Sequence, residues 1–215
     1  MLRLLRASKA PENGPPVEPE TVDPLGSLAQ AAVRGERQAE RTLLVTVGPS
    51  LLRAVRGVLG AANPDVEDVV QEAMSALLAA LPTFRGECRI IHFASRIAVQ
   101  TALSARRHAG YRNRYTPAAS PEELADLARD ERSPADARAA AERLEAFRSL
   151  LGELPEVQAE ALVLHSVLGY SVDETAALQR VPVNTVRSRL RNGIARLRAR
   201  VLVDPKLVAI LGPEP

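Results

Sequence analysis

The chain has 215 residues, 46% of them apolar but only 3% aromatic, and a formal net charge of +2. This length suits one medium-sized domain or two small ones around an aliphatic core, and the small net charge excludes a uniformly polycationic surface. The single cysteine, Cys88, excludes an intrachain disulfide, and no uninterrupted apolar run is long enough to span a membrane. We therefore expect a cytoplasmic protein with no membrane insertion of its own.

The first half of the chain has the periodicity of a helical domain behind a polar leader. Residues 7–24 are rich in proline, glutamate and small polar side chains, which is typical of a disordered segment, and we predict a disordered leader at 1–23. Apolar residues at helical spacing then predict helices over 25–32 and 38–47 (one helix or a pair), 51–59, 65–81 and about 89–107. Asp65 is placed to cap the most regular of these helices or to lie in its first turn, and Pro82 ends it.

An acidic segment separates this half from a second helical region. Residues 115–137 contain three prolines, and from Ser120 to Asp136 there are six acidic side chains against two arginines, so we predict a flexible linker. Strand patterns are absent. The sequence therefore predicts an all-α fold with two small helical domains joined by a flexible acidic linker. Its parts are a leader at 1–23, a domain at 24–114, the linker at 115–137, a domain at 138–203 and a tail at 204–215.

The second domain ends in a helix-turn-helix pattern. A first helix at 171–178 is followed by a break at 179–182 and by a second helix that begins at Asn184. One face of the second helix is apolar and predicts a buried stripe made of Val186, Leu190, Ile194, Leu197 and Val201. The opposite face is polar and cationic, which suits phosphates and base edges in the major groove of DNA. It consists of Asn184, Arg187, Ser188 and Arg191.

The charge pattern favours a DNA-binding helix over an ordinary solvated helix face. Seven arginines and no acid lie between Thr175 and Val203, and the whole chain has only two lysines. Guanidinium groups bind phosphates and guanine edges bidentately. An exposed cationic row is common by itself, but here it coincides with the turn and with the apolar stripe.

Two separate stretches then carry a family resemblance. The first comprises residues 63–72 (NPDVEDVVQE), 81–87 (LPTFRGE) and 96–98 (RIA), and the second comprises 154–156 (LPE), 169–174 (GYSVDE) and 184–190 (NTVRSRL). In this order and spacing they resemble the extracytoplasmic-function (ECF) group of bacterial RNA polymerase sigma factors. Members of that group have two helical domains, called regions two and four, joined by a short linker.

The resemblance implies a role for each domain. The helix at 65–81 would bind core RNA polymerase through Asp65, Asp68, Gln71 and Glu72. The loop and helix after it would bind and melt the minus-ten promoter element and hold an extruded base, through Phe84, Arg85, Gly86, Ile90, Phe93, Arg96, Gln100, Arg106 and Arg107. Region four would bind the minus-thirty-five element through Asn184, Thr185, Arg187, Ser188, Arg189, Arg191 and Asn192. The family also implies an anti-sigma factor that covers the same helices, and an acidic linker that occupies polymerase channels later filled by nucleic acid.

Some residues depart from the family pattern in the melting region. Phe93 stands where a tryptophan is usual, and Ile90 and Ser95 occupy positions that are often aromatic. Because base–aromatic stacking contributes roughly 1–3 kcal/mol per base, these departures indicate weaker or differently specified melting. Gln100 replaces a common asparagine, and in region four Asn184 and Asn192 replace a usual glycine and arginine.

Two other functions fit parts of the pattern. The first is a DNA-binding regulator that uses the helix-turn-helix alone, with residues 25–114 as a sensing or dimerising module. The second is a helical adaptor that binds only proteins, for which duplex binding would lack the steep salt dependence of phosphate neutralisation. Charge reversal on the surface from Asp65 to Glu72 distinguishes the sigma factor from the regulator, because only the sigma factor requires polymerase binding there.

The sequence offers no catalytic, cofactor or metal site. Three histidines, His92, His108 and His165, are too dispersed for a zinc pattern, and His165 fits a hydrogen-bonded structural role. Cys88 is better explained as a small core filler than as a redox sensor. Glycine-rich phosphate loops and nucleophile–base pairs are also missing. We therefore expect a protein that is not an enzyme and needs no cofactor.

Overall fold

The structure, a computed structural model, describes residues 23–112 and 134–212. Residues 1–22 of the leader predicted at 1–23, and most of the predicted linker at 115–137, lie outside these residues. Within the described ranges every regular element is helical. A first group contains α2 (Gly26–Val33), α3 (Arg37–Leu59), α4 (Val66–Ala80), the 3-10 turn η1 (Leu81–Thr83) and α5 (Ile90–Arg112). A second group contains α7 (Pro134–Leu151), α8 (Glu156–Leu162), the π-helical turn η2 (Val163–Val167), α9 (Val172–Gln179), α10 (Val183–Val203) and α11 (Pro205–Leu211).

Helix α3 is one continuous helix, so the predicted interruption between 47 and 51 was wrong. Pro49 lies inside it, where it removes one backbone hydrogen bond at a cost of about 3 kcal/mol. Burial of an apolar stripe on both sides of the proline offsets this cost, because Val47 and Leu51 are both fully buried in the core.

The first group packs around α3 and α5, which lie against each other, with α2 and α4 on their flanks. Helix α4 confirms the regular pattern predicted for 65–81, since Val66, Val69, Ala73 and Leu77 form its buried face. Asp65 occupies the N-cap position, but its side chain makes no capping hydrogen bond. Helix α5 continues to Arg112, beyond the predicted end near residue 107.

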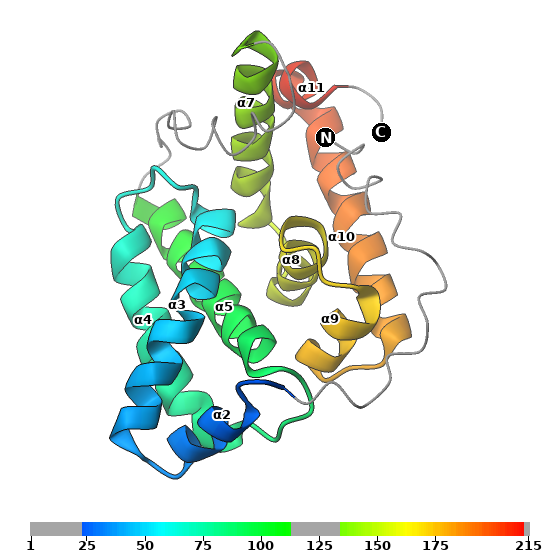
Figure 1. Ribbon diagram of the computed structural model, residues 1–215. Coiled ribbons are helices and arrows are strands. Elements are labelled where there is room, and N and C mark those ends of the chain that lie inside the picture. Colours follow the sequence, from blue (N-terminus) through cyan, green and yellow to red (C-terminus); the bar gives the residue numbers. More distant parts are fainter. Residues whose placement is uncertain (1–22, 113–133, 213–215) are drawn as a thin grey trace.

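The second group contains one helix that the sequence pattern did not reveal. Helix α10 ends at Val203 as predicted, and Asp204 then caps a further short helix, α11, by accepting a hydrogen bond from Lys206 N. Figure 1 shows α11 beside α7, and contacts join these two helices. The acid–proline pair at 204–205 thus ends one helix and also starts another.

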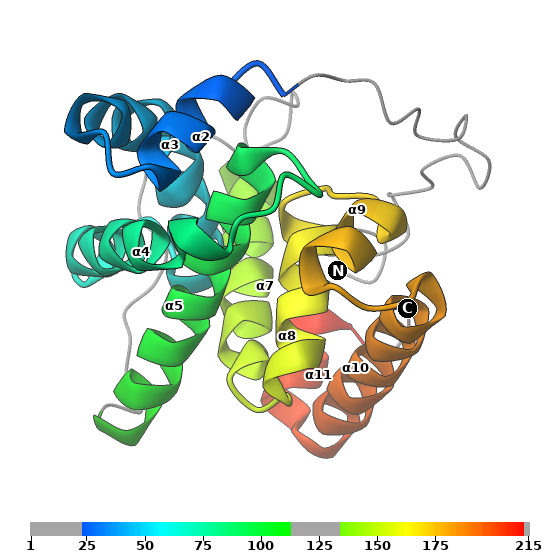
Figure 2. The same cartoon turned by 90° about the horizontal axis from the view of Figure 1, so that it is seen from below.

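The two groups lie against each other through α5, which contacts α8 and α9, and through α3, which contacts η2. Figure 2 shows the first group on the left and the second group on the right, and contacts join α5 with α8. Arg148 of α7 is 5% exposed and donates hydrogen bonds to the carbonyls of Arg56 and Gly57 in the last turn of α3. The Arg56 carbonyl also accepts a hydrogen bond from Gly60 N, so the guanidinium adds a second donor there, and its positive charge complements the helix dipole.

Candidate nucleic-acid interface

The helix-turn-helix begins with a side-chain cap that fixes the start of α9. Ser171 Oγ accepts from Glu174 N at 3.1 Å, and Glu174 Oε2 accepts from Ser171 N at 2.8 Å. This reciprocal pair satisfies two backbone donors at the helix start. At the other end Arg180 adopts a left-handed conformation, with φ of 52°, and turns the chain toward α10.

The predicted apolar stripe of α10 is confirmed and sets which face of the helix points outward. Val186, Leu190 and Leu197 are buried, and Ile194 and Val201 pack against the same core. Gly193 is also on this face and lets α10 approach α8 closely. A Cβ atom there would lie 2.9 Å from Leu162 Cδ1. The back of the helix is therefore fixed by tight packing.

The front of α10 carries most of the predicted DNA-binding residues. Asn184, Arg187, Arg191 and Asn192 are exposed, and Thr185 and Ser188 are half-buried. Arg187 Nη1 lies 3.3 Å from Asn184 Oδ1, so these two side chains are neighbours on the surface. Arg189 differs from the rest of the set. Its Nη1 donates to Gln179 Oε1 at 2.7 Å and ties α10 to α9.

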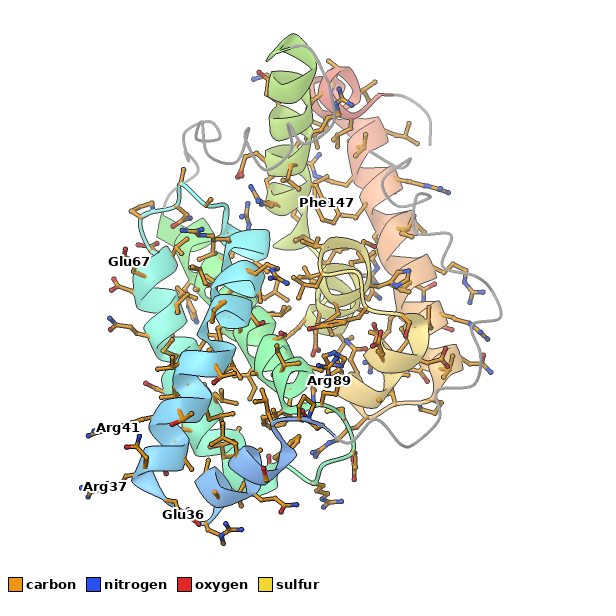
Figure 3. All side chains as sticks on the ribbon, in the orientation of Figure 1. Glu36, Arg37, Arg41, Glu67, Arg89 and Phe147 are labelled. Carbon is orange, nitrogen blue, oxygen red and sulfur yellow. The ribbon has the colours of Figure 1, made fainter. Side chains whose placement is uncertain are left out.

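The predicted polymerase-binding residues lie on the outer face of α4. Asp65, Asp68, Gln71 and Glu72 are all exposed. Within the described residues, none of their side chains makes an ion pair or a hydrogen bond. Figure 3 shows Glu67, the neighbour of Asp68, at the outer edge of the molecule. This face of α4 is therefore anionic, and its predicted contact side chains have no partner among the described residues.

The structure moves two of the predicted melting residues into the core. Ile90 is fully buried and Phe93 is 8% exposed, so neither side chain offers a surface to a base in this arrangement. Phe93 packs instead on Phe84, with ring centroids 5.2 Å apart. Arg85 and Gly86 are exposed at the tip of the loop, where Gly86 has a positive φ of 74°. The fully exposed residues of this set thus lie in the loop.

The second group covers two polar residues of α5 that the sequence assigned to the minus-ten element. Arg96 Nε donates to Glu160 Oε1 of α8 at 2.8 Å, and Gln100 Nε2 donates to the same oxygen at 3.2 Å. Glu160 is only 3% exposed. A buried carboxylate requires such partners because an unpaired charge in the interior costs several kcal/mol.

The next arginines along α5 also have partners. Arg106 Nη1 donates to the Val58 carbonyl at 2.9 Å, and its Nη2 lies 3.5 Å from Glu145 Oε1. Burial lowers the pKa of the Arg106 guanidinium from its ordinary value, and Glu145 acts in the opposite direction. Arg107 Nη1 lies 3.2 Å from Glu156 Oε2. All four predicted cationic or amide contacts on α5 are therefore engaged by protein groups in this arrangement.

Sequence reasoning missed the acids and the aromatic residue that face α5. Glu160 stands in the apolar run from Ala159 to Leu164, and an isolated acid within a buried run is a signal that could have pointed to an ion pair. The sequence around Tyr170 contains no comparable signal. The Tyr170 ring packs against that of His92 at a centroid distance of 4.7 Å with the planes tilted by 50°, a contact that follows only from how the two groups pack.

The remaining titratable side chains support structural roles. His165 Nδ1 lies 2.7 Å from the Tyr170 carbonyl, as expected for a hydrogen-bonded structural histidine. Burial raises the pKa of the Cys88 thiol and lowers the pKa of His92. Among the described residues no group of histidine, cysteine and acidic side chains could hold a metal ion. By length and hydropathy α3 could cross a membrane, but its apolar face forms the core of the first group.

Comparison with known proteins agrees with this geometry. The family model for sigma-70 region 2 matches residues 43–112, and that for sigma-70 region 4 matches residues 144–197. The ECF RNA polymerase sigma factor ShbA of Streptomyces griseus is 30% identical over 184 residues, which cover 81% of this chain and 94% of ShbA. The ECF sigma-E factor of Escherichia coli is 28% identical over 188 residues, covering 86% of this chain and 94% of that protein.

A solved structure is similar to the whole arrangement. The structure of CnrH in complex with the cytosolic domain of CnrY has a TM-score of 0.50 and 27% identity, and it covers 83% of this chain and 97% of the matched chain. Two helical regions with a helix-turn-helix at the end of the second define a transcription factor of the sigma-70 type. The chain belongs to the ECF RNA polymerase sigma factors, which act in transcription initiation.

Proposed function

We propose that the two helical groups divide the work of promoter recognition in this sigma factor. The first group, predicted as a domain at 24–114, binds core RNA polymerase and the minus-ten element. The second, predicted at 138–203, binds the minus-thirty-five element. The observation that carries this proposal is the two-faced α10, whose buried back forces Arg187 and Arg191 outward. Cationic side chains fixed on a helix front suit the major groove.

Core polymerase binding is assigned to the outer face of α4. Its exposed acids have no ion-pair partner among the described residues, so a basic surface on the polymerase can neutralise them without breaking internal contacts. The acidic linker passes through polymerase channels that later hold nucleic acid. Such a dissociable subunit acts beside DNA in the cytoplasm.

Melting of the minus-ten element is assigned to the loop with Arg85 and Gly86 and to the polar residues of α5. A protein without ATP hydrolysis opens DNA by differential binding, in which contacts to an extruded base offset an unstacking cost of a few kcal/mol. Arg96 Nε and Gln100 Nε2 now donate to Glu160, so these two donors become available for such contacts when Glu160 leaves them. Recognition of the minus-ten element therefore requires the two groups to separate.

An anti-sigma factor is inferred as the regulator. CnrH, which has a similar fold, was solved with the cytosolic domain of CnrY bound to it. In this chain the exposed faces of α4 and α10 are the surfaces that such a protein would have to cover to block polymerase and DNA together.

Reconstituted transcription tests the proposal. The full chain is mixed with core polymerase, association is measured by pull-down, and run-off transcripts are counted on genomic promoter fragments. Association together with promoter-specific transcripts above core polymerase alone is the expected result. A chain that fails to bind core polymerase but binds duplex DNA would instead be a regulator that uses only its helix-turn-helix.

A further inference from the structure

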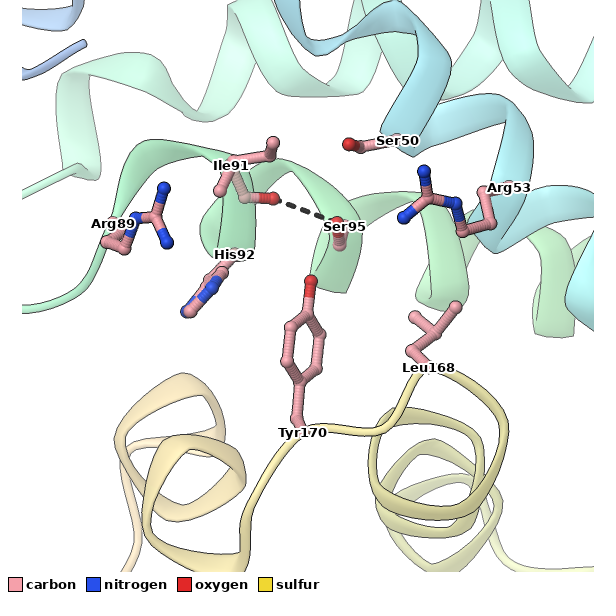
Figure 4. A pocket seen from close by; sticks show the side chains of 8 residues that line it. All are labelled: Ser50, Arg53, Arg89, Ile91, His92, Ser95, Leu168 and Tyr170. Atoms are coloured by element: carbon pink, nitrogen blue, oxygen red, sulfur yellow. Dashed lines mark hydrogen bonds between the residues drawn. The ribbon is translucent and has the colours of Figure 1, made fainter. Parts of the chain in front are cut away.

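A small cavity lies where the two helical groups meet, outside the residues assigned to polymerase or promoter binding. Its volume is about 200 Å³, and its walls come from α3, from the start of α5 and from the turn that precedes α9. Figure 4 shows Arg53 and Arg89 on opposite sides of this space, with Tyr170 rising between them toward Ser95. The cavity therefore has two walls from the first group and a third from the second.

The cavity is positively charged. Arg53 and Arg89 both line it, and neither makes an ion pair with another residue in the described part of the chain. No acidic side chain lines it. The carboxylates that act on His92 are those of Glu174 and Asp23, and both accept hydrogen bonds from backbone N–H groups, at Ser171 and Ile90 respectively.

Polar groups complete the lining. Ser50 and Ser95 carry hydroxyls, and His92 and Tyr170 add an imidazole and a phenol. Burial raises the pKa of Tyr170, while a side-chain hydrogen bond with Ser95 and the more weakly acting charges of Arg53 and Arg89 lower it. The phenol therefore stays protonated at neutral pH, and it can donate to a bound oxyanion by exchanging its present hydrogen bond with Ser95.

Guanidinium forks and hydroxyl donors around a small space are the chemistry that recognises a tetrahedral oxyanion. The cavity opens to solvent, where Arg53 and Arg89 are exposed, and it is smaller than the roughly 300–1,000 Å³ that enclose drug-sized ligands, so it suits a group of the size of a phosphate. We propose that this cavity binds inorganic phosphate or the phosphate group of a small phosphate monoester, with Arg53, Arg89 and Tyr170 as its main contacts.

The position of the cavity gives this binding a consequence. Tyr170 belongs to the second group and Arg53 to the first, so a bound phosphate contacts both and stabilises the arrangement in which Glu160 covers Arg96. Phosphate would thus favour the closed form and oppose promoter binding. This consequence rests on the proposed function, whereas phosphate binding by the free chain does not.

Titration of the free full-length chain with inorganic phosphate, followed by phosphorus NMR line broadening at constant ionic strength, tests the site. A second titration uses glycerol phosphate, which separates free phosphate from a monoester as the preferred form. We expect saturable binding that becomes at least about tenfold weaker in Arg53→Gln and in Arg89→Gln, because each loses a charged hydrogen-bond donor. Arg41→Gln is the matched control, since Arg41 is exposed on the same helix as Arg53 and points away from the second group in Figure 3.

Tyr170→Ala tests whether the site bridges the groups and should weaken binding as the arginine variants do. Tyr170→Phe keeps the ring and removes only the hydroxyl, so it serves if the alanine variant does not fold. Equal binding by the Arg41→Gln and Arg53→Gln variants would overturn the proposal, as would line broadening that sodium chloride abolishes in proportion to ionic strength. Binding of a single-stranded oligonucleotide but not of inorganic phosphate would also overturn it and would assign the arginines to the DNA path.

Discussion

The Arg96 guanidinium of α5 and the Glu160 carboxylate of α8 form a 2.8 Å hydrogen-bonded ion pair between residues 64 positions apart in the chain. Glu160 is nearly inaccessible, whereas the Arg96 side chain keeps 23% of its exposure. A carboxylate thus occupies the place on Arg96 that a DNA phosphate would take in the proposed function. This ion pair therefore contributes both to the packing of the two helical groups and to the control of DNA binding.

Glu160→Gln should loosen this contact. The amide loses the negative charge, and we expect the free energy of unfolding to fall by about 1–3 kcal/mol, as for a weakened hydrogen bond to a charged group. Promoter-DNA binding by the free chain should increase, because Arg96 is released. Equilibrium urea unfolding and fluorescence anisotropy with a minus-ten oligonucleotide measure the two effects.

Glu156→Gln, on the same helix, is the matched control for the unfolding measurement. Its ion pair with Arg107 is much more exposed, since 48% of the Glu156 side chain and 36% of the Arg107 side chain are accessible. We therefore expect the free energy of unfolding to fall by less than about 1 kcal/mol. If both variants bind the oligonucleotide like the unchanged chain, Glu160 does not restrict access to α5.

Charge reversal on α4 should abolish polymerase binding. Asp68→Arg places a cation in the proposed acidic interface, where like charges cost several kcal/mol, while the exposed position leaves the fold intact. Pull-down with core polymerase measures the loss. Glu36→Arg reverses an exposed charge at the opposite end of the first group from Glu67 in Figure 3 and should bind normally. Undiminished binding by Asp68→Arg would remove α4 from the interface.

Arg191→Ala should weaken use of the upstream promoter element. If Arg191 makes a bidentate contact to a base, the free energy of promoter binding weakens by about 1–3 kcal/mol, and only on promoters that carry that base. Run-off transcription on a set of single-base promoter variants measures it. Arg198→Ala, on the same helix and also exposed, is the control. A loss of equal size on every sequence would identify Arg191 as a phosphate contact.

Gly193→Ala should destabilise the second group by about 1–3 kcal/mol, because the new methyl overpacks the contact between α10 and α8. Its Cβ would approach Leu162 Cδ1 to 2.9 Å, and Leu162 is fully buried and cannot move aside freely. Thermal unfolding measures the loss. A double variant with Leu162→Ala should lose less stability than the sum of the losses in the two single variants, because the smaller side chain at 162 leaves space for the new methyl group. Strict additivity would show that the two residues do not compete for the same space.

Local patterns in the chain were enough to predict the helices and the recognition helix. Amphipathic spacing identified α4 and the buried stripe of α10, because a helix repeats every 3.6 residues and its buried face can be read from neighbouring positions. The same reasoning predicted a break near Pro49, where burial in the core carries α3 through the proline. A local rule fails there because the compensating contacts come from other helices.

The amino-acid sequence alone established an all-α chain with a DNA-type helix-turn-helix and an acidic helix face, since each of these depends on residues within a few turns of one another. The other features depend on how the helices pack in three dimensions. This packing buried Ile90 and Phe93, tied Arg189 to Gln179, and brought Glu160 and Tyr170 onto α5. These contacts join residues on different helices, many of them distant in the chain. Their energies depend on how the helices are placed in space, which no local spacing encodes.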